Sequence, residues 1–198
     1  MRITGGMARG IRLHLPARGE IRPTTDFLRG AVFSSLGSLV NGARVLDVFA
    51  GTGAYGFEAL SRGAAHAHFV EKNPAAVTAI GQNAALVAKS CRWEKTARKT
   101  AVSTRDMMTW APPGGVAFDL VFCDPPWALW ERLADGLLAR VVSWASGANA
   151  RVVLETPGEF LPTVPEGWCL RRHLARGRNQ PAACILGRAE PSSISAIS

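Results

Sequence analysis

Short, mostly apolar segments alternate with longer segments of helical periodicity between residues 44 and 155. This alternation is typical of stacked βαβ units around a mostly parallel sheet, and the apolar runs suit strands that are buried on both faces. We therefore predict an α/β fold. The expected strands cover residues 44–49, 68–71, 101–104, 119–123 and 151–154, followed by two further strands at 168–172 and 182–186.

Helical patterns fill the gaps between these strands. Asn73 is a favourable N-cap residue and Pro74 suits a first helical position, so we expect a helix to begin there. The other predicted helices cover residues 26–39, 54–61 and 129–144. On the first of them, the expected apolar stripe consists of Phe27, Ala31, Leu36 and Leu39.

The composition indicates a single domain that needs no covalent or metal support. The chain has 198 residues, of which 47% are hydrophobic, and a core of that size is stable without disulfides or a structural metal. The four cysteines form no CxxC pair, so we expect reduced thiols and no metal site. Because the chain shows neither a signal peptide nor a membrane span, we expect a soluble, cytoplasmic protein. We also expect a monomer. The Ser-rich residues 189–198 are predicted to form a disordered tail.

The charge distribution suggests a polyanionic partner. The net charge is +8, and basic residues gather within residues 1–30, within 89–105 and at Arg171, Arg172, Arg176 and Arg178. Nucleic acid and a membrane surface both suit such a charge. We favour nucleic acid, because no basic amphipathic helix with a bulky apolar face is present.

A glycine-rich turn follows the first predicted strand. Gly51, Gly53 and Gly56 satisfy GxGxxG where a strand turns into a helix, so a ligand can approach the backbone closely. The pattern alone does not separate a dinucleotide from other ligands. Asp47 precedes the turn, and a carboxylate there disfavours a phosphate and favours a cationic or amino-bearing group.

Acidic residues at the ends of the next two strands complete a predicted cofactor site. Glu71 is placed to accept hydrogen bonds from ribose hydroxyls, and Asp106 to reach an adenine amine, with Met107 beside the ring. S-adenosylmethionine carries an amino group, a sulfonium, a ribose and an adenine, and it is the expected cofactor. The expected cofactor-binding residues are Asp47, Phe49, Ala50, Gly51, Thr52, Gly53, Gly56, Glu71, Lys72, Asn73, Asp106 and Met107.

The fourth predicted strand ends in a motif that suits methyl transfer to an amine. Asp124, Pro125, Pro126 and Trp127 should open into the same crevice as the glycine turn, and they are the expected catalytic residues. The Asp124 carboxylate and the Pro125 carbonyl can accept hydrogen bonds from an exocyclic NH2 group, which directs its lone pair toward a methyl donor. The aromatic ring of Trp127 can stack on a base held out of its helix.

This motif matches the signature of methyltransferases that act on exocyclic amines, and more narrowly the chain resembles the RsmD family, which methylates N2 of one guanine in bacterial 16S ribosomal RNA. The segments that carry the resemblance are 2–6 with Arg9 and Gly10, 22–26, 45–64, 69–73 and 124–127. Trp127 stands where Phe or Tyr is usual in that family. The region from Arg176 to Leu186 lacks the aromatic residues expected in the family's final strand.

The resemblance implies a class I, Rossmann-like S-adenosylmethionine-dependent methyltransferase fold with a seven-stranded, mostly parallel sheet. It implies an N-terminal β extension over residues 1–24 and a methyltransferase domain over 25–188. The substrate would be 16S rRNA or the assembling small subunit, with Asp124 accepting the guanine amine protons. The residues expected to contact RNA are Arg2, Arg9, Arg12, Arg22 and Thr24.

Three alternatives remain open from the sequence. A DNA methyltransferase acting on adenine N6 or cytosine N4 would use the same motif, although no separate target-recognition domain is evident. An NAD(P)-dependent oxidoreductase would use GxGxxG, but Asp47 argues against it. A non-catalytic RNA-binding assembly protein would not need the intact Asp-Pro-Pro motif.

Overall fold

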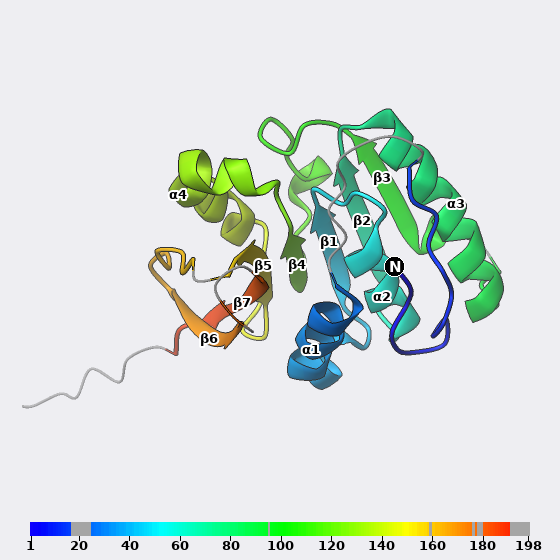
Figure 1. The fold of residues 1–198 in the computed structure, drawn as a ribbon, viewed down its shortest axis with the longest axis horizontal. Helices are drawn as coiled ribbons and strands as arrows, with labels where there is room; N and C mark the ends of the chain where they lie inside the picture. The colour runs from blue at the N-terminus through cyan, green and yellow to red at the C-terminus, as the bar shows by residue number, and fades with distance from the viewer. Residues whose placement is uncertain (17–24, 95, 159, 176, 178–179, 191–198) are drawn as a thin grey trace, which may run out of the picture.

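A seven-stranded sheet with the strand order β3-β2-β1-β4-β5-β7-β6 runs through the molecule (Figure 1). The structure is a computed structural model that describes residues 1–16, 25–94, 96–158, 160–175, 177 and 180–190. The strands are β1 (Arg44–Val48), β2 (His66–Glu71), β3 (Thr100–Thr104), β4 (Leu120–Cys123), β5 (Arg151–Pro157), β6 (Trp168–Leu174) and β7 (Pro181–Arg188).

The sheet is parallel except where β7 lies between β5 and β6, with an antiparallel pairing on each side. This arrangement confirms the predicted α/β class and the number of strands. The predicted end of β5 at residue 154 was wrong, because the register with β7 continues through Pro157 and its partner Pro181. Phe49 was predicted in the first strand, but its φ of 55° ends that strand at Val48.

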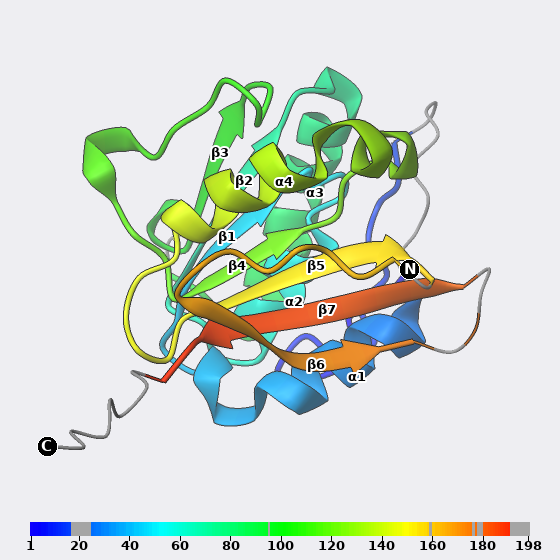
Figure 2. The same cartoon turned by 90° about the vertical axis from the view of Figure 1, so that its left-hand side faces the viewer.

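Within the described residues, α-helices cover both faces of the sheet (Figure 2). The helices α1 (Asp26–Leu36), α2 (Ala54–Ser61) and α3 (Pro74–Cys91) pack on one face, and α4 (Trp127–Ser143) packs on the other. The expected N-cap at Asn73 is confirmed, since its side chain accepts a hydrogen bond from the Ala75 N–H at 2.9 Å. Within the described ranges, no helix is both long and apolar enough to cross a membrane.

The apolar stripe predicted for α1 was partly wrong. Phe27 is 56% exposed, whereas the buried apolar side chains are Leu28, Val32, Phe33 and Leu36. The helix ends at Gly37, which adopts a left-handed φ of 54°, so Leu39 belongs to the following 3-10 turn, η1 (Gly37–Val40). The prediction was wrong because it treated Arg29, a charged residue, as facing solvent, whereas Arg29 is buried on this face of α1.

A buried ion cluster attaches the N-terminal segment to the rest of the molecule. Glu58 on α2 accepts hydrogen bonds from the Thr4 N–H and hydroxyl, both at 2.7 Å, and pairs with Arg29 at 3.3 Å and Arg62 at 2.8 Å. Arg29 also donates to the Arg2 carbonyl. These contacts hold residues 1–16 against α1 and α2, where Arg2 and Arg12 form an isolated antiparallel bridge.

The domain boundaries proposed from the sequence stay predictions. Arg22 and Thr24 lie outside the described residues, as do residues 191–198 of the expected tail. The four cysteines are free thiols: Cys91, Cys123 and Cys184 are buried and Cys169 is half-buried.

Candidate active site

A cavity of about 550 Å³ lies at the carboxyl ends of β1, β2, β4 and β5, where the polar residues following each buried strand meet. Nearly all the predicted catalytic and cofactor-binding residues line it. They are Asp47, Phe49, Ala50, Gly51, Thr52, Glu71, Lys72, Asn73, Asp106, Met107, Asp124, Pro125, Pro126 and Trp127. The strand order therefore joins the glycine turn and the Asp-Pro-Pro motif in one site.

Gly53 and Gly56 do not line the cavity, and their role is in packing. A Cβ atom on Gly56 would lie 2.3 Å from the Phe69 ring, and one on Gly53 would lie 2.6 Å from the Phe57 ring. Gly53 is also the N-cap of α2 in a left-handed conformation with a φ of 77°. These glycines let α2 approach the sheet closely, which holds the turn in place.

Asp47 is a buried acid whose charge is not balanced by any cation among the described residues. Its side chain is 2% exposed and accepts one hydrogen bond, from the Gly56 N–H at 2.9 Å. The ion pairs of the described residues do not include it. Burial raises the pKa of Asp47 to about 8, the Gly56 hydrogen bond opposes that rise, and the nearby charge of Glu71 adds to it. A cationic ligand group would stabilise the ionised form.

Glu71 is held in one orientation by backbone donors from two sides. One carboxylate oxygen accepts a hydrogen bond from the Gly51 N–H at 2.8 Å, and the other accepts one from the Asn73 N–H at 2.8 Å. Each oxygen keeps a second lone pair, so the carboxylate can still accept hydroxyl hydrogen bonds from a ligand. The glycine turn and the acid at the end of β2 thus form one rigid unit.

Asp106 and Met107 line the cavity after β3. A hydrogen bond from the Met108 N–H and the ion pair with Lys72, at 3.0 Å, lower the pKa of Asp106. Asp106 is therefore ionised and oriented at neutral pH. Met107, only 2% exposed, gives the cavity an apolar wall beside it.

The Asp-Pro-Pro motif connects β4 directly to α4. Pro126 is the N-cap of α4, and Trp127 is its first residue, two positions before the predicted helix start. The Asp124 side chain is half-buried in the cavity. The neighbouring thiol stays protonated, because burial and the charges of Asp124 and Asp47 raise the pKa of Cys123 well above its usual value.

Glu155 and Tyr55 also line the cavity, and the sequence analysis did not include them. The Tyr55 hydroxyl donates a hydrogen bond to the Glu155 carboxylate at 3.2 Å, and Glu155 is 4% exposed. Burial, Glu155 and Asp124 raise the pKa of Tyr55 well above its usual value, so it remains a neutral donor. The available signal was an acid directly after a buried apolar strand, the same pattern that identified Asp124.

The described residues expected to contact RNA are exposed and lie outside the cavity lining. These are Arg2, Arg9 and Arg12. Arg2 pairs with Asp26 at 3.2 Å. The N-terminal segment nevertheless reaches the cavity, because Met1 lines it and accepts a hydrogen bond on its sulfur from the Thr52 hydroxyl at 3.4 Å.

Comparisons with known proteins match almost the whole chain. A family model described as Conserved hypothetical protein 95 covers residues 1–184. The Ribosomal RNA small subunit methyltransferase D of Escherichia coli strain K12 is 34% identical over 185 residues, which are 90% of this chain and 86% of that protein. The protein of the same name from Haemophilus influenzae is 31% identical over 179 residues and covers 89% of each chain.

Solved structures agree with these sequence matches. A putative methyltransferase from Escherichia coli superposes with a TM-score of 0.78 at 31% identity, covering 96% of this chain and 99% of the other. A hypothetical protein from a Thermus species superposes with a TM-score of 0.70 at 30% identity, covering 93% and 98%. The match therefore extends over both the cavity and the N-terminal segment.

Proposed function

This chain belongs to the RsmD family of methyltransferases, the family described as Conserved hypothetical protein 95, and on that premise we propose that it methylates an exocyclic amine of small-subunit ribosomal RNA with S-adenosylmethionine as the methyl donor. The observation that carries the proposal is one cavity that joins the unbalanced buried acid Asp47 to the Asp124 motif.

The residues of the cavity fit the chemical groups of S-adenosylmethionine. This cofactor supplies, when bound, an electrophilic methyl group on a sulfonium. Asp47 would balance the positive charge at the amino end of the ligand, and the oriented carboxylate of Glu71 would accept hydrogen bonds from the ribose. Asp106 and Met107 would bind the adenine through its amine and its ring face.

Asp124 and the Pro125 carbonyl would then orient the attacking amine. An exocyclic amine of a base is a poor nucleophile, because its lone pair is delocalised into the ring. Two acceptors at the end of β4 would take hydrogen bonds from its N–H groups and leave the lone pair directed at the methyl carbon. The Trp127 ring would stack on the base and exclude water from this face.

The second acid, Glu155, favours guanine N2 as the target. The Watson–Crick edge of guanine places the N1–H donor beside the N2 amine, whereas adenine and cytosine place an acceptor nitrogen beside their amines. Asp124 and Glu155 both lie close enough to Tyr55 to raise its pKa, so two acceptors share this end of the cavity. We infer that Glu155 accepts the N1–H hydrogen bond while Asp124 and the Pro125 carbonyl accept those of N2.

The exposed arginines of the N-terminal segment would contact the phosphates around the target base. Arg2, Arg9 and Arg12 are exposed, which supports this role. Arg22 and Thr24 keep the same role as a prediction from the sequence.

The experiment that tests this proposal is transfer of a labelled methyl group from S-adenosylmethionine to three substrates, followed by nucleoside analysis. The substrates are small subunits that lack the modification, naked 16S rRNA and duplex DNA. We expect N2-methylguanosine in the subunit or rRNA sample. Label in DNA alone would instead support a DNA amino methyltransferase, and no label in any sample would support a non-catalytic RNA-binding protein.

A further inference from the structure

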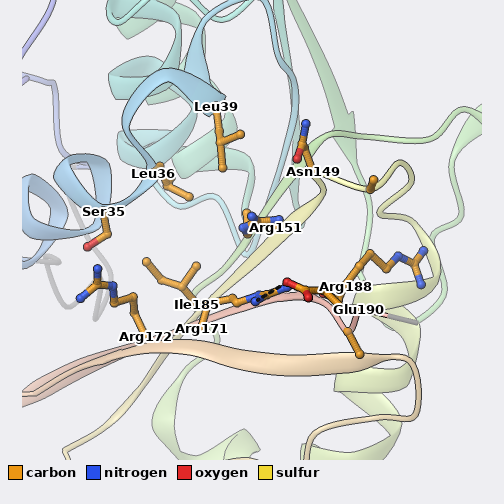
Figure 3. Close-up of a pocket in the computed structure, with 12 residues that line it drawn as sticks. Ser35, Leu36, Leu39, Asn149, Arg151, Arg171, Arg172, Ile185, Arg188 and Glu190 are labelled. Carbon is orange, nitrogen blue, oxygen red and sulfur yellow. Dashed lines mark hydrogen bonds and ion pairs between the residues drawn. The ribbon is translucent and has the colours of Figure 1, made fainter. Parts of the chain in front are cut away.

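A second cleft, of about 580 Å³, lies near the amino end of β5, away from the active site. It is lined by the end of α1, by η1, and by residues of β5, β6 and β7 (Figure 3). Arg151, Arg171 and Arg172 converge on it from two strands, and Ser35 and Asn149 add polar groups at its rim. The function proposed above assigns no role to this cluster.

A β-bulge brings two consecutive arginines to the same cleft. In a regular strand, adjacent side chains point to opposite faces of the sheet. The register of β6 against β7 pairs Leu170 with Leu186 and Arg172 with Ile185, so Arg171 is an extra residue. Bulges of this kind redirect side chains and are over-represented near functional sites. Because of it, both Arg171 and Arg172 line the cleft.

Gly187 provides the space that these arginines occupy. It pairs with Arg151 across β5 and β7, and it is buried. A Cβ atom at this position would lie 3.0 Å from two atoms of the Arg171 side chain and 3.2 Å from the Arg151 guanidinium. A larger residue would push the two guanidinium groups out of their present positions.

The positive charge of the cleft is poorly balanced by the protein. Arg171 donates a hydrogen bond to the Arg188 carbonyl at 2.7 Å, and Arg151 donates one to the Ala150 carbonyl at 2.9 Å. These carbonyl acceptors orient the guanidinium groups without neutralising them. Among the described residues that line the cleft, the only acid is Glu190, whose side chain is 86% exposed and lies 4.0 Å from Arg171.

The electrostatics of Arg151 agree with this geometry. Burial and the neighbouring charge of Arg171 lower the pKa of Arg151. Two like charges are therefore held close together, and an anion between them would relieve their repulsion. Arginine is well suited to such a ligand, because its planar guanidinium binds phosphate with two parallel hydrogen bonds.

We propose that this cleft binds phosphate groups of the rRNA backbone and gives the enzyme a second contact with its substrate, away from the active site. This inference rests on the proposed rRNA methyltransferase function. Arg171 and Arg172 are exposed and Arg151 is half-buried, so the cleft opens to solvent as a bound polymer requires.

The position of the cleft allows one RNA to reach both sites. Arg151 and Glu155 are four residues apart on the same face of β5, about 13 Å along the strand. The helix α1 begins beside Arg2 and ends at the cleft, a length of about 16 Å. The N-terminal arginines and the cleft therefore both lie beside α1, and Glu155 of the active site shares the face of β5 that carries Arg151.

The test compares two double variants that lose the same charge. Arg171→Gln/Arg172→Gln removes the positive charges of the two exposed arginines that line the cleft. Arg92→Gln/Arg98→Gln removes two exposed arginines next to β3, at the far edge of the sheet. The affinity of each protein for 16S rRNA is measured as a function of salt concentration.

We expect the cleft variant to lower the slope of log affinity against log salt by about two, and the control variant to keep the wild-type slope. The cleft variant should also keep wild-type affinity for S-adenosylmethionine and wild-type thermal stability, which excludes misfolding. An unchanged slope, or an equal loss in both variants, would overturn the proposal.

A free anion is the other source of the same chemistry, and pyrophosphate is the probe for it. Pyrophosphate stabilisation of the wild type that is lost in the cleft variant, together with an unchanged RNA slope, would identify a small-anion site and overturn the rRNA contact. Failure of the wild type to methylate rRNA would refute the proposed function separately, since the salt slopes decide the binding question without turnover.

Discussion

Two acids on neighbouring elements, Glu58 and Asp47, are buried almost equally but are compensated very differently. The Glu58 side chain is fully buried and receives two guanidinium groups and two hydrogen bonds from Thr4. Asp47 is 2% exposed and, within the described part of the chain, receives a single backbone N–H. The protein pairs the first acid with its own cations, whereas burial keeps the second protonated until a cationic ligand group stabilises its ionised form.

This difference indicates a structural role for Glu58 and a ligand-binding role for Asp47. Burying a charge is costly unless it is paired, so an unbalanced buried acid needs a reason to persist. For Glu58 the reason is attachment of the N-terminal segment, and for Asp47 it is the cationic group of the cofactor. The exposed fraction alone does not distinguish Glu58 from Asp47, since both residues are almost fully buried.

The largest expected effect is on stability and comes from Arg29→Met. Removing this guanidinium leaves Glu58 buried with less compensation, and we expect a loss of about 3–5 kcal/mol in the free energy of unfolding. Urea denaturation measures it. The double variant with Glu58→Gln should recover part of the loss, and a change below about 1 kcal/mol in the single variant would show that the ion pair is not needed.

Asp47→Asn should weaken the binding of S-adenosylmethionine by about 10- to 100-fold while leaving the fold intact. The estimate follows from losing one charged hydrogen bond, about 1.5–3 kcal/mol. Isothermal titration calorimetry of the wild type and the variant gives the ratio. Equal affinities would remove Asp47 from the cofactor site.

The raised pKa of Asp47 should make the free energy of unfolding depend on pH. The folded-state pKa of Asp47 is about 8 and its ordinary value is 3.8, so the folded protein binds the extra proton. The stabilisation that goes with protonated Asp47 is therefore fully present below about pH 4 and is lost as the pH rises to about 8. Over this range the free energy of unfolding falls by up to about 1.4 kcal/mol per pH unit. Asp47→Asn should abolish this slope. Parallel pH profiles for the wild type and the variant in denaturant titrations would contradict the assignment.

The smallest expected effect comes from Arg22→Ala and concerns two cations, Arg29 and Arg22. Arg29 is used inside the protein, whereas Arg22 is predicted from the sequence to serve the substrate. Arg22→Ala should leave the unfolding free energy within about 0.5 kcal/mol and lower the salt slope of rRNA binding by about one. Filter binding across salt concentrations measures that slope, and an unchanged value would exclude Arg22 from the interface.

Most of the residues that the sequence proposed for the site line one cavity, because they follow a local rule, and their roles stay predictions. Asp47, Glu71 and Asp124 each stand in or just after an apolar run, and parallel strands bring such ends to one edge. The predicted family and the class I fold are confirmed by the relatives and the solved structures.

Of the features that the sequence analysis missed, Glu155 had a local signal, since it directly follows an apolar run, and the others depend on long-range contacts. Pairing with β7, which extends β5 through Glu155, is not visible in that run. The buried position of Arg29 depends on Glu58, which is 29 residues away along the chain, so no periodicity could indicate it. The convergence of Arg171 and Arg172 depends on a bulge that only the partner strand defines.

The central claim is that Asp124 orients the target amine while the rest of the cavity holds the cofactor. Its most direct test is Asp124→Ala, with cofactor affinity and methyl transfer to small subunits measured on the same preparation. We expect S-adenosylmethionine to bind with the wild-type affinity and methyl transfer to fall by at least about 100-fold. Loss of cofactor binding, or methyl transfer at the wild-type rate, would contradict the claim.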